Sequence, residues 1–247
     1  MNIIPESETQ ITIGKMVANN FRTAEVFRKY GIDFCCKGGR LLSDVCNEKN
    51  LDFEAIENEL IEKSSTATPI SEDEYHIMAP DVLVDHIVNV HHTYVRESIP
   101  PLLAFLNKIN KVHSTRHPEL AEIYDLFEGC AKELTHHMVK EENILFPAIK
   151  KLATSAQTGS SVQPFFFGPL ENPIGMMQQE HITEGERFFR IAELTGNFIP
   201  PEDACTTYRV AFQKLEEFQN DLFMHIHLEN NILFPKSLEY EKNIMLT

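Results

Sequence analysis

The apolar residues of the second part of the chain recur with a helical period. From position 81 onward, one stripe repeats at steps of four, three and four residues: Leu83, Ile87, Val90 and Tyr94. A neighbouring stripe comprises Val84, Val88, His92, Val95 and Ile99. Both stripes follow the 3.6-residue period of an α-helix, and together they are wide. We therefore expect this helix to be buried over much of its circumference.

Three further long helices are predicted after it. Helical patterns run over 118–151, 172–196 and 202–238, and the pattern over 172–196 has Asn172 as its N-cap and Pro173 at its first helical position. A long Ser-, Gly- and Pro-rich connection separates the pattern over 118–151 from the pattern over 172–196. Because a four-helix bundle tolerates such a crossover, the predicted fold class is all-α, with a four-helix bundle over 81–247.

The first part of the chain predicts shorter helices. Helical segments over 21–30, 40–49 and 53–63 are bounded by Gly31, by the Gly38-Gly39 pair and by Asp52, which are residue types that cap helices or form turns. Residues 64–80 are polar, acidic and interrupted by prolines, with no sustained apolar period. We expect a small helical domain over 1–63, a linker over 64–80 and the bundle over 81–247.

The composition limits the classes of partner. The chain has 247 residues, with 22 Lys and Arg against 37 Asp and Glu, and its formal net charge of −15 disfavours nucleic acid and anionic lipid. No apolar run reaches the roughly 18–20 residues that span a bilayer, and the first residues lack a signal-peptide pattern. We expect a cytoplasmic protein that binds neither nucleic acid nor membrane, with its five cysteines reduced.

An internal repeat carries the strongest chemical signal. The string H-x-x-x-E-x-N-I-L-F-P begins at His137 and again at His225, 225 − 137 = 88 residues later. Duplication of a two-helix unit explains this spacing in a bundle. Among His and acidic side chains, only His137/His225 and Glu141/Glu229 occur in both copies. A His and a Glu four residues apart lie on one helix face, so each copy directs two ligands at one point.

Two further histidines lie at matched distances before these pairs. His181 precedes His225 by 225 − 181 = 44 residues, and His92 precedes His137 by 137 − 92 = 45. His91 would give 46, so the repeat mildly favours His92. A single H-x-x-x-E pair is usually a surface interaction, but the duplication and the matched histidines favour a shared buried site.

These six side chains predict a two-metal centre. Four imidazoles and two bridging carboxylates would give each ion four protein atoms and leave positions for an oxo or hydroxo bridge and a small ligand. Such mixed ligation favours iron, then manganese, over a closed structural zinc site. His86 and His91 stay undecided. The other histidines are expected to be solvated or to support the ligands: His76, His113, His117, His136 and His227.

Three features together resemble a known family. They are the H-x-x-x-E-[EN]-N-I-L-F-P repeat, the Glu180-His181 pair, and the segment GIDFCCKGGR at 31–40. Over nearly its whole length the chain resembles the Ric family (repair of iron centres), a branch of the hemerythrin-like bundles. The resemblance implies two oxo- or hydroxo-bridged non-haem Fe ions and selects His92 over His91. The ligands it implies, with both Glu bridging, are His92, His137, Glu141, His181, His225 and Glu229.

The adjacent cysteines Cys35 and Cys36 permit two interpretations. Lys37 and Arg40 follow them closely, just before a predicted helix, and this environment lowers a thiol pKa and favours redox chemistry. Alternatively, both cysteines are apolar fillers in a small core. The chain departs from the family pattern Cys-Cys-Gly-Gly because Lys37 precedes the glycines. Three other cysteines are expected to be buried and structural: Cys46, Cys130 and Cys205.

The resemblance implies a function that has two rivals. The family restores iron-sulfur clusters damaged by nitric oxide or oxidants, which implies iron donation, damaged iron-sulfur proteins as partners, and nitric oxide and oxygen as small ligands. The site could instead serve a nitric oxide reductase or a peroxide-consuming oxidoreductase, or a sensor of oxygen or nitric oxide. Four protein atoms per ion favour labile or reactive iron over reversible oxygen carriage. The alternatives of monomer and homodimer stay open.

Overall fold

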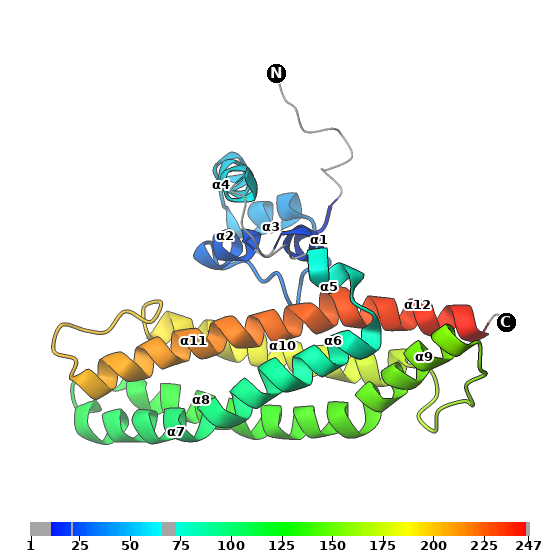
Figure 1. The fold of residues 1–247 in the computed structure, drawn as a ribbon. Helices are drawn as coiled ribbons and strands as arrows, with labels where there is room; N and C mark the ends of the chain where they lie inside the picture. The colour runs from blue at the N-terminus through cyan, green and yellow to red at the C-terminus, as the bar shows by residue number, and fades with distance from the viewer. Residues whose placement is uncertain (1–10, 21, 66–72, 246–247) are drawn as a thin grey trace.

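The computed structural model describes residues 11–20, 22–65 and 73–245. Within these ranges the protein is all-α, with a single isolated antiparallel bridge between Thr12 and Leu41. Four long helical runs lie alongside one another, and a group of short helices sits on one side of them (Figure 1). This confirms the predicted fold class. In the same ranges no helix combines the length and apolar character needed to cross a membrane.

Three of the four long runs contain a π-helical turn between two α-helices. The first run consists of α6 (Pro80–Ile87), η2 (Val88–His92) and α7 (Thr93–His113). The second consists of α8 (Glu119–Lys140), η3 (Glu141–Leu145) and α9 (Phe146–Thr158). The third is α10 (Glu171–Leu194) alone. The fourth consists of α11 (Thr206–Leu228), η4 (Glu229–Leu233) and α12 (Phe234–Met245).

The ends of these runs differ by several residues from the predicted ends. The second run continues past residue 151 to Thr158 and stops at Gly159, whose φ of 68° lies in the left-handed region that favours glycine. The fourth run begins at Thr206 rather than at residue 202 and continues past residue 238. The periodicity of apolar residues predicts that a long helix is present but does not fix the residues at which it begins and ends.

The π turns η3 and η4 coincide with the repeated sequence string. Each is followed directly by a Phe-Pro pair, with the prolines at Pro147 and Pro235. Proline has no N–H to donate to the carbonyl four residues earlier, and its ring crowds that carbonyl. The wider π turn accommodates this defect without ending the helix. Such turns are rare and are frequent at functional sites.

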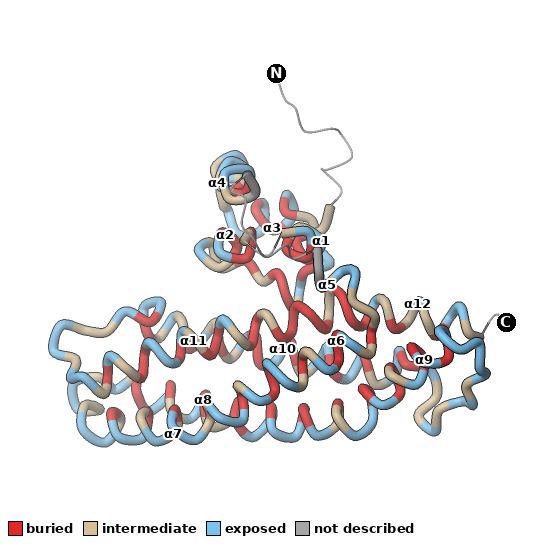
Figure 2. Tube along the Cα trace, in the orientation of Figure 1, coloured by how far each residue is buried: buried red, intermediate tan, exposed pale blue. Residues whose placement is uncertain are grey.

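Two groups of buried apolar side chains fill the bundle. One lies among α7, α8, α10 and α11 and includes Phe127, Phe188 and Phe218, with ring centroids 5.2–6.4 Å apart. The other lies among α6, α9, α10 and α12 and includes Ile149 and Phe234. Figure 2 shows the buried residues on the inward sides of the long helices. The π turns lie between these two groups along the chain, so side chains on them reach the middle of the bundle.

The small helices at the start of the chain pack onto this middle region. They are α1 (Ile13–Asn19), α2 (Thr23–Lys29), α3 (Leu42–Lys49) and α4 (Phe53–Ser65). Helix α1, which the sequence patterns did not predict, contacts α11 and η4 (Figure 1). Two predicted caps are confirmed, since Asp52 accepts from the Ala55 N–H at 3.1 Å and Gly31 has a φ of 62°. The predicted cap at Asn172 is wrong, because α10 already begins at Glu171 and the Asn172 side chain donates to the Phe167 carbonyl instead. Helix α5 (Asp73–Ile77) lies in the predicted linker, whose residues 66–72 are outside the described ranges.

A close backbone approach fixes the turn after the adjacent cysteines. The Gly14 N–H donates to the Gly38 carbonyl at 2.7 Å. A Cβ at Gly38 would lie 2.3 Å from the Phe34 carbonyl oxygen and 2.8 Å from the Gly14 Cα, so no larger residue fits. The turn therefore requires glycine at position 38, and the extra residue Lys37 is placed on the surface, where it is exposed.

His227 lies in the contact between the small helices and the bundle. It is 2% exposed, packs edge-on against Phe34 with ring centroids 6.3 Å apart, and accepts a hydrogen bond from Asn231 Nδ2 at 2.9 Å. Of the two roles expected for it, solvated or supporting the ligands, the solvated one is excluded by this burial. Burial, with a smaller effect of the charge on His76, lowers the pKa of His227 to about 3. The imidazole is neutral at physiological pH and acts as a packing residue.

We predict that His227 makes the fold acid-sensitive. The unfolded chain takes up a proton at this residue below its ordinary pKa of 6.5, whereas the folded chain excludes that proton down to about pH 3. The unfolded state then binds more protons, so the free energy of unfolding falls as the pH decreases, by at most about 1.4 kcal/mol per pH unit. His227→Gln keeps an acceptor for Asn231 and does not titrate.

Urea unfolding between about pH 7 and pH 5 measures this effect. The free energy of unfolding should fall less steeply in His227→Gln than in the wild type. His136→Gln, which removes an exposed histidine, is the matched control for the loss of one imidazole. Equal slopes for the wild type and His227→Gln would contradict the assignment.

Candidate metal centre

Six buried side chains converge at the level of the π turns. Helix α10 provides one of them, and the other five come from the residues in and just before η2, η3 and η4. Their exposed fractions are all 2% or less, and they are the six predicted ligands: His92, His137, Glu141, His181, His225 and Glu229. The side-chain nitrogen and oxygen atoms form two groups, each containing two His and both Glu, with all atoms in a group within 4.8 Å of one another.

Glu141 faces both groups. Its Oε2 lies 3.3 Å from His92 Nε2, and its Oε1 lies 3.2 Å from His137 Nε2. The two oxygens of one carboxylate thus point at two different imidazoles. This is the arrangement of a carboxylate that bridges two ions.

Glu229 is arranged in the same way from the opposite copy of the repeat. Its Oε1 lies 3.1 Å from His225 Nε2, and its Oε2 lies 3.1 Å from His181 Nε2. His92 and His225 therefore share one group, and His137 and His181 share the other. The two copies of the repeat therefore provide equivalent halves of the site.

The imidazoles within each group have the spacing of ligands on one ion. The Nε2 atoms of His92 and His225 are 3.2 Å apart, and those of His137 and His181 are 3.1 Å apart. Two nitrogens bound at about 2.1 Å and about 90° apart would be separated by about 3.0 Å. Both pairs fit an ion placed between them.

Carboxylates on the outer side orient two of the imidazoles. His92 Nδ1 lies 2.6 Å from Glu142 Oε1, and His137 Nδ1 lies 2.8 Å from Glu180 Oε2. An ionised carboxylate only accepts, so Nδ1–H is the donor in each pair and the Nε2 lone pair is left facing the centre. Two such lone pairs at hydrogen-bond distance repel each other unless a proton or a cation lies between them.

An amide orients a third imidazole and links it to the small helices. His181 Nδ1 donates to Asn230 Oδ1 at 2.9 Å, and Asn230 Nδ2 donates to the Cys35 carbonyl at 3.0 Å. The second bond fixes which way the amide points, because only its nitrogen can donate to a carbonyl. His181 is therefore held in the same tautomer as His92 and His137.

The buried carboxylates of the centre require positive charge close to them. Glu141 Oε1 and Oε2 and Glu229 Oε2 are buried without a hydrogen bond. Burial would lower the pKa of His137, but Glu141 and Glu180 outweigh it and raise that pKa to about 10. Burial likewise opposes the charge on Glu229, yet His225 and His181 hold its pKa well below the usual range. The carboxylates thus favour protonation of His137 and His225, whose pKa values are both raised, and bound cations would replace those protons.

The two copies of the repeat differ in the residues that support the imidazoles. Glu142 and Asn230 occupy the same repeat position, and each accepts a hydrogen bond from a ligand histidine of another helix. Glu180 corresponds to His91. Glu180 accepts one hydrogen bond from His137 and another from Lys140. Both bonds lower the pKa of the Glu180 carboxyl, to about 2, and the bond from His137 has the larger effect.

His91 plays a different part from its counterpart. Its ring stacks on that of His225 with centroids 5.7 Å apart at 11°, and its Nδ1 binds Asp221 Oδ1 at 2.9 Å. His91 is buried outside the two groups of candidate ligand atoms, whereas His92 lies in one of them. His86, also undecided from the sequence, is half-buried and packs edge-on against His91.

The cysteines lie outside the centre, and one prediction about them is wrong. Cys46 and Cys130 are buried as expected, but Cys205, expected to be buried, is exposed. Burial raises the pKa of Cys35 well above its usual value, and the neighbouring Cys36 and Asp33 raise it further. Lys37 and Arg40 pair with Glu186 and Glu48. Of the two interpretations of the adjacent cysteines, this environment favours a packing role for Cys35 in the resting protein.

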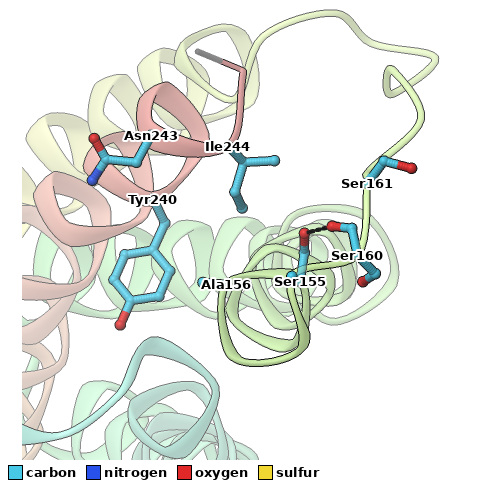
Figure 3. Close-up of a pocket in the computed structure, with 8 residues that line it drawn as sticks. Ser155, Ala156, Ser160, Ser161, Tyr240, Asn243 and Ile244 are labelled. Carbon is cyan, nitrogen blue, oxygen red and sulfur yellow. Dashed lines mark hydrogen bonds between the residues drawn. The ribbon is translucent and has the colours of Figure 1, made fainter. Parts of the chain in front are cut away.

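A separate pocket lies between α9 and α12, near the end of the bundle (Figure 3). Its walls include Ser155, Ser160, Tyr240 and Asn243, and Ser155 donates a hydrogen bond to the Ser160 carbonyl. None of the six predicted ligands lines it. Its hydroxyl and amide groups offer no charged ligand, and we assign the candidate chemistry to the His and Glu centre.

Comparisons with known proteins agree with this geometry. A family profile described as the hemerythrin HHE cation binding domain matches residues 83–237, and a profile described as a domain of unknown function, DUF542, matches residues 9–64. Proteins named iron-sulfur cluster repair protein YtfE from Enterobacter sp. (strain 638) and Citrobacter koseri are 35% and 34% identical to the chain. Each alignment covers 93% of this chain and 97% of that protein. The protein of the same name from Yersinia pestis is 34% identical over 89% of this chain and 93% of its own length.

We predict that Glu141→Leu weakens metal binding in both groups. The change removes one oxygen from each ion, whereas His136→Asn alters an exposed neighbour of a ligand and should leave the metal content unchanged. Even the loss of a hydrogen-bond partner of a ligand costs about 10- to 100-fold in affinity, so the loss of a ligand should cost at least as much. Metal analysis of the purified variants checks this, and a wild-type metal content in Glu141→Leu would refute the ligand set.

Proposed function

Since the chain belongs to the family of hemerythrin-like iron-sulfur cluster repair proteins, we propose that it is a di-iron protein that repairs damaged iron-sulfur clusters. Its partners would be iron-sulfur proteins whose clusters have lost iron or reacted with nitric oxide or oxidants, and the cytoplasm would be its compartment. The observation that carries the proposal is the pair of buried carboxylates, each of which directs one oxygen at each of two histidine pairs.

The grouping of the side chains supports a site for two ions. His92 and His225 would hold one ion, His137 and His181 would hold the other, and both carboxylates would bridge them. Imidazole and carboxylate donors suit iron, and the lack of a thiol among them argues against a site built for a softer metal. When bound, the pair supplies exchangeable iron, one-electron redox chemistry and positions for nitric oxide or oxygen.

The surrounding residues prepare the site. Glu142, Glu180 and Asn230 hold three imidazoles in the tautomer that binds a metal, so little reorganisation is needed when an ion arrives. The apolar groups on both sides of the π turns exclude water from the bridging carboxylates. The support is unequal, because His225 Nδ1 is buried without such an acceptor while the other three histidines have one. Unequal support is compatible with a centre that releases one ion while it retains the other.

A repair assay tests the proposal. An iron-sulfur dehydratase inactivated by nitric oxide or peroxide should regain activity when incubated anaerobically with the iron-loaded protein. Glu141→Leu should restore little activity because it holds little iron, and His136→Asn should match the wild type. If the iron-loaded protein consumed nitric oxide through many turnovers with an electron donor but never reactivated the dehydratase, the repair proposal would fail and the reductase would be favoured.

A further inference from the structure

Asp33, Cys35 and Cys36 form a second group of metal-binding atoms beside the centre. The backbone bends after Phe34, so the adjacent cysteines turn their sulfur atoms to the same side, with Sγ atoms 3.6 Å apart. Asp33 Oδ1 lies 3.5 Å from Cys35 Sγ. One atom from each of the three side chains falls within a span of 4.8 Å.

These separations match those of ligands on one tetrahedral ion. Two sulfurs bound at about 2.3 Å would lie about 3.8 Å apart, and a sulfur and an oxygen bound at about 2.3 and 2.1 Å would lie about 3.6 Å apart. We propose that Cys35 Sγ, Cys36 Sγ and Asp33 Oδ1 bind a borderline divalent cation of the zinc and ferrous-iron class. This site is additional to the His and Glu centre and does not depend on the proposed function.

The chemistry of the donors selects this class of cation. Thiolates favour zinc, iron and softer ions, and a carboxylate disfavours purely soft ions such as Cu(I). Binding of one divalent cation displaces the two thiol protons to solvent. Those protons now serve weak hydrogen bonds, from Cys35 Sγ to Asp33 Oδ1 and from Cys36 Sγ to the His181 carbonyl at 3.1 Å.

The surroundings permit entry and reversible binding. Cys35 is buried, but Asp33 and Cys36 are only half-buried, so a cation can approach from their side. Three protein ligands leave one position open, unlike a closed structural zinc site. Lys37 pairs with the exposed Glu186, and the nearby charges of Asp33 and Cys36 also raise its pKa. Its positive charge would offset part of the negative charge of two thiolates and a carboxylate.

The bundle is shaped to receive this group. A Cβ at Gly185 would lie 3.0 Å from Cys36 Sγ, so the absence of a side chain there leaves room for the sulfur against α10. Cys36 touches the backbone of His181, and the Cys35 carbonyl is bonded to the amide that orients the same histidine. The proposed cation site therefore adjoins one ligand of the centre through two separate contacts.

Titration with Co²⁺ tests the proposal. The iron-loaded full-length protein, kept anaerobic and reduced, is titrated with Co²⁺, whose sulfur-to-cobalt charge-transfer absorption reports only thiolate ligation. The wild type should bind one Co²⁺ with this absorption. Cys36→Ser, a half-buried position, should abolish the absorption while the iron content stays at the wild-type value. Asp33→Asn keeps the acceptor for the Cys36 N–H at 2.8 Å and should weaken Co²⁺ binding at least about tenfold.

The controls separate this site from other thiols and from the centre. Cys205→Ser removes the exposed thiol and should leave the absorption unchanged, as should Cys46→Ala within the same small domain. An absorption that survives in Cys36→Ser, or disappears in Cys205→Ser, overturns the proposal, and so does Co²⁺ binding without charge-transfer absorption. Iron counting and dehydratase reactivation are measured on the same samples, so failure of this site is distinguishable from failure of the repair function.

Discussion

Two carboxylates buried side by side at the centre of an apolar bundle are the constraint on which the structure depends. Glu141 and Glu229 are fully buried, and each raises the cost of ionising the other. A buried charge without compensation costs several kcal/mol. Here the compensation comes from four imidazoles, and it is incomplete as long as protons are the only cations present, because three carboxylate oxygens have no hydrogen bond. Divalent cations between the two carboxylates would complete this compensation.

This constraint explains features that are distant from it in sequence. The π turns place His92, Glu141 and Glu229 at matching depths, and the prolines that follow two of these turns make a regular α-helix unfavourable there. The acceptors behind the imidazoles fix the tautomers that the carboxylates and metals require. Asn230 extends this network to the small helices, because it bonds both His181 and the Cys35 carbonyl. The orientation of His181 therefore depends on how the small helices pack against the bundle.

The six central residues could be predicted from the sequence because a comparison of the two duplicated halves keeps the His and Glu that occur in both and sets aside those that occur in one. The same filter passed over Glu142 and Asn230, which differ in residue type although both present a side-chain oxygen to a histidine. Their shared position in the repeat was the available signal. The cysteine chemistry was not predictable, because burial of Cys35 and the pairing of Lys37 with Glu186 depend on contacts between residues far apart in the chain. Helix ends and the helix α1 were missed because short amphipathic patterns do not fix them.

Mössbauer spectroscopy combined with metal counting on anaerobically purified, iron-loaded protein tests the central claim most directly. A bridged centre should hold two irons per chain, bound by nitrogen and oxygen, and the two iron ions should show the magnetic coupling that bridging carboxylates impose. A single iron per chain, or two irons without magnetic coupling, would contradict the bridged centre.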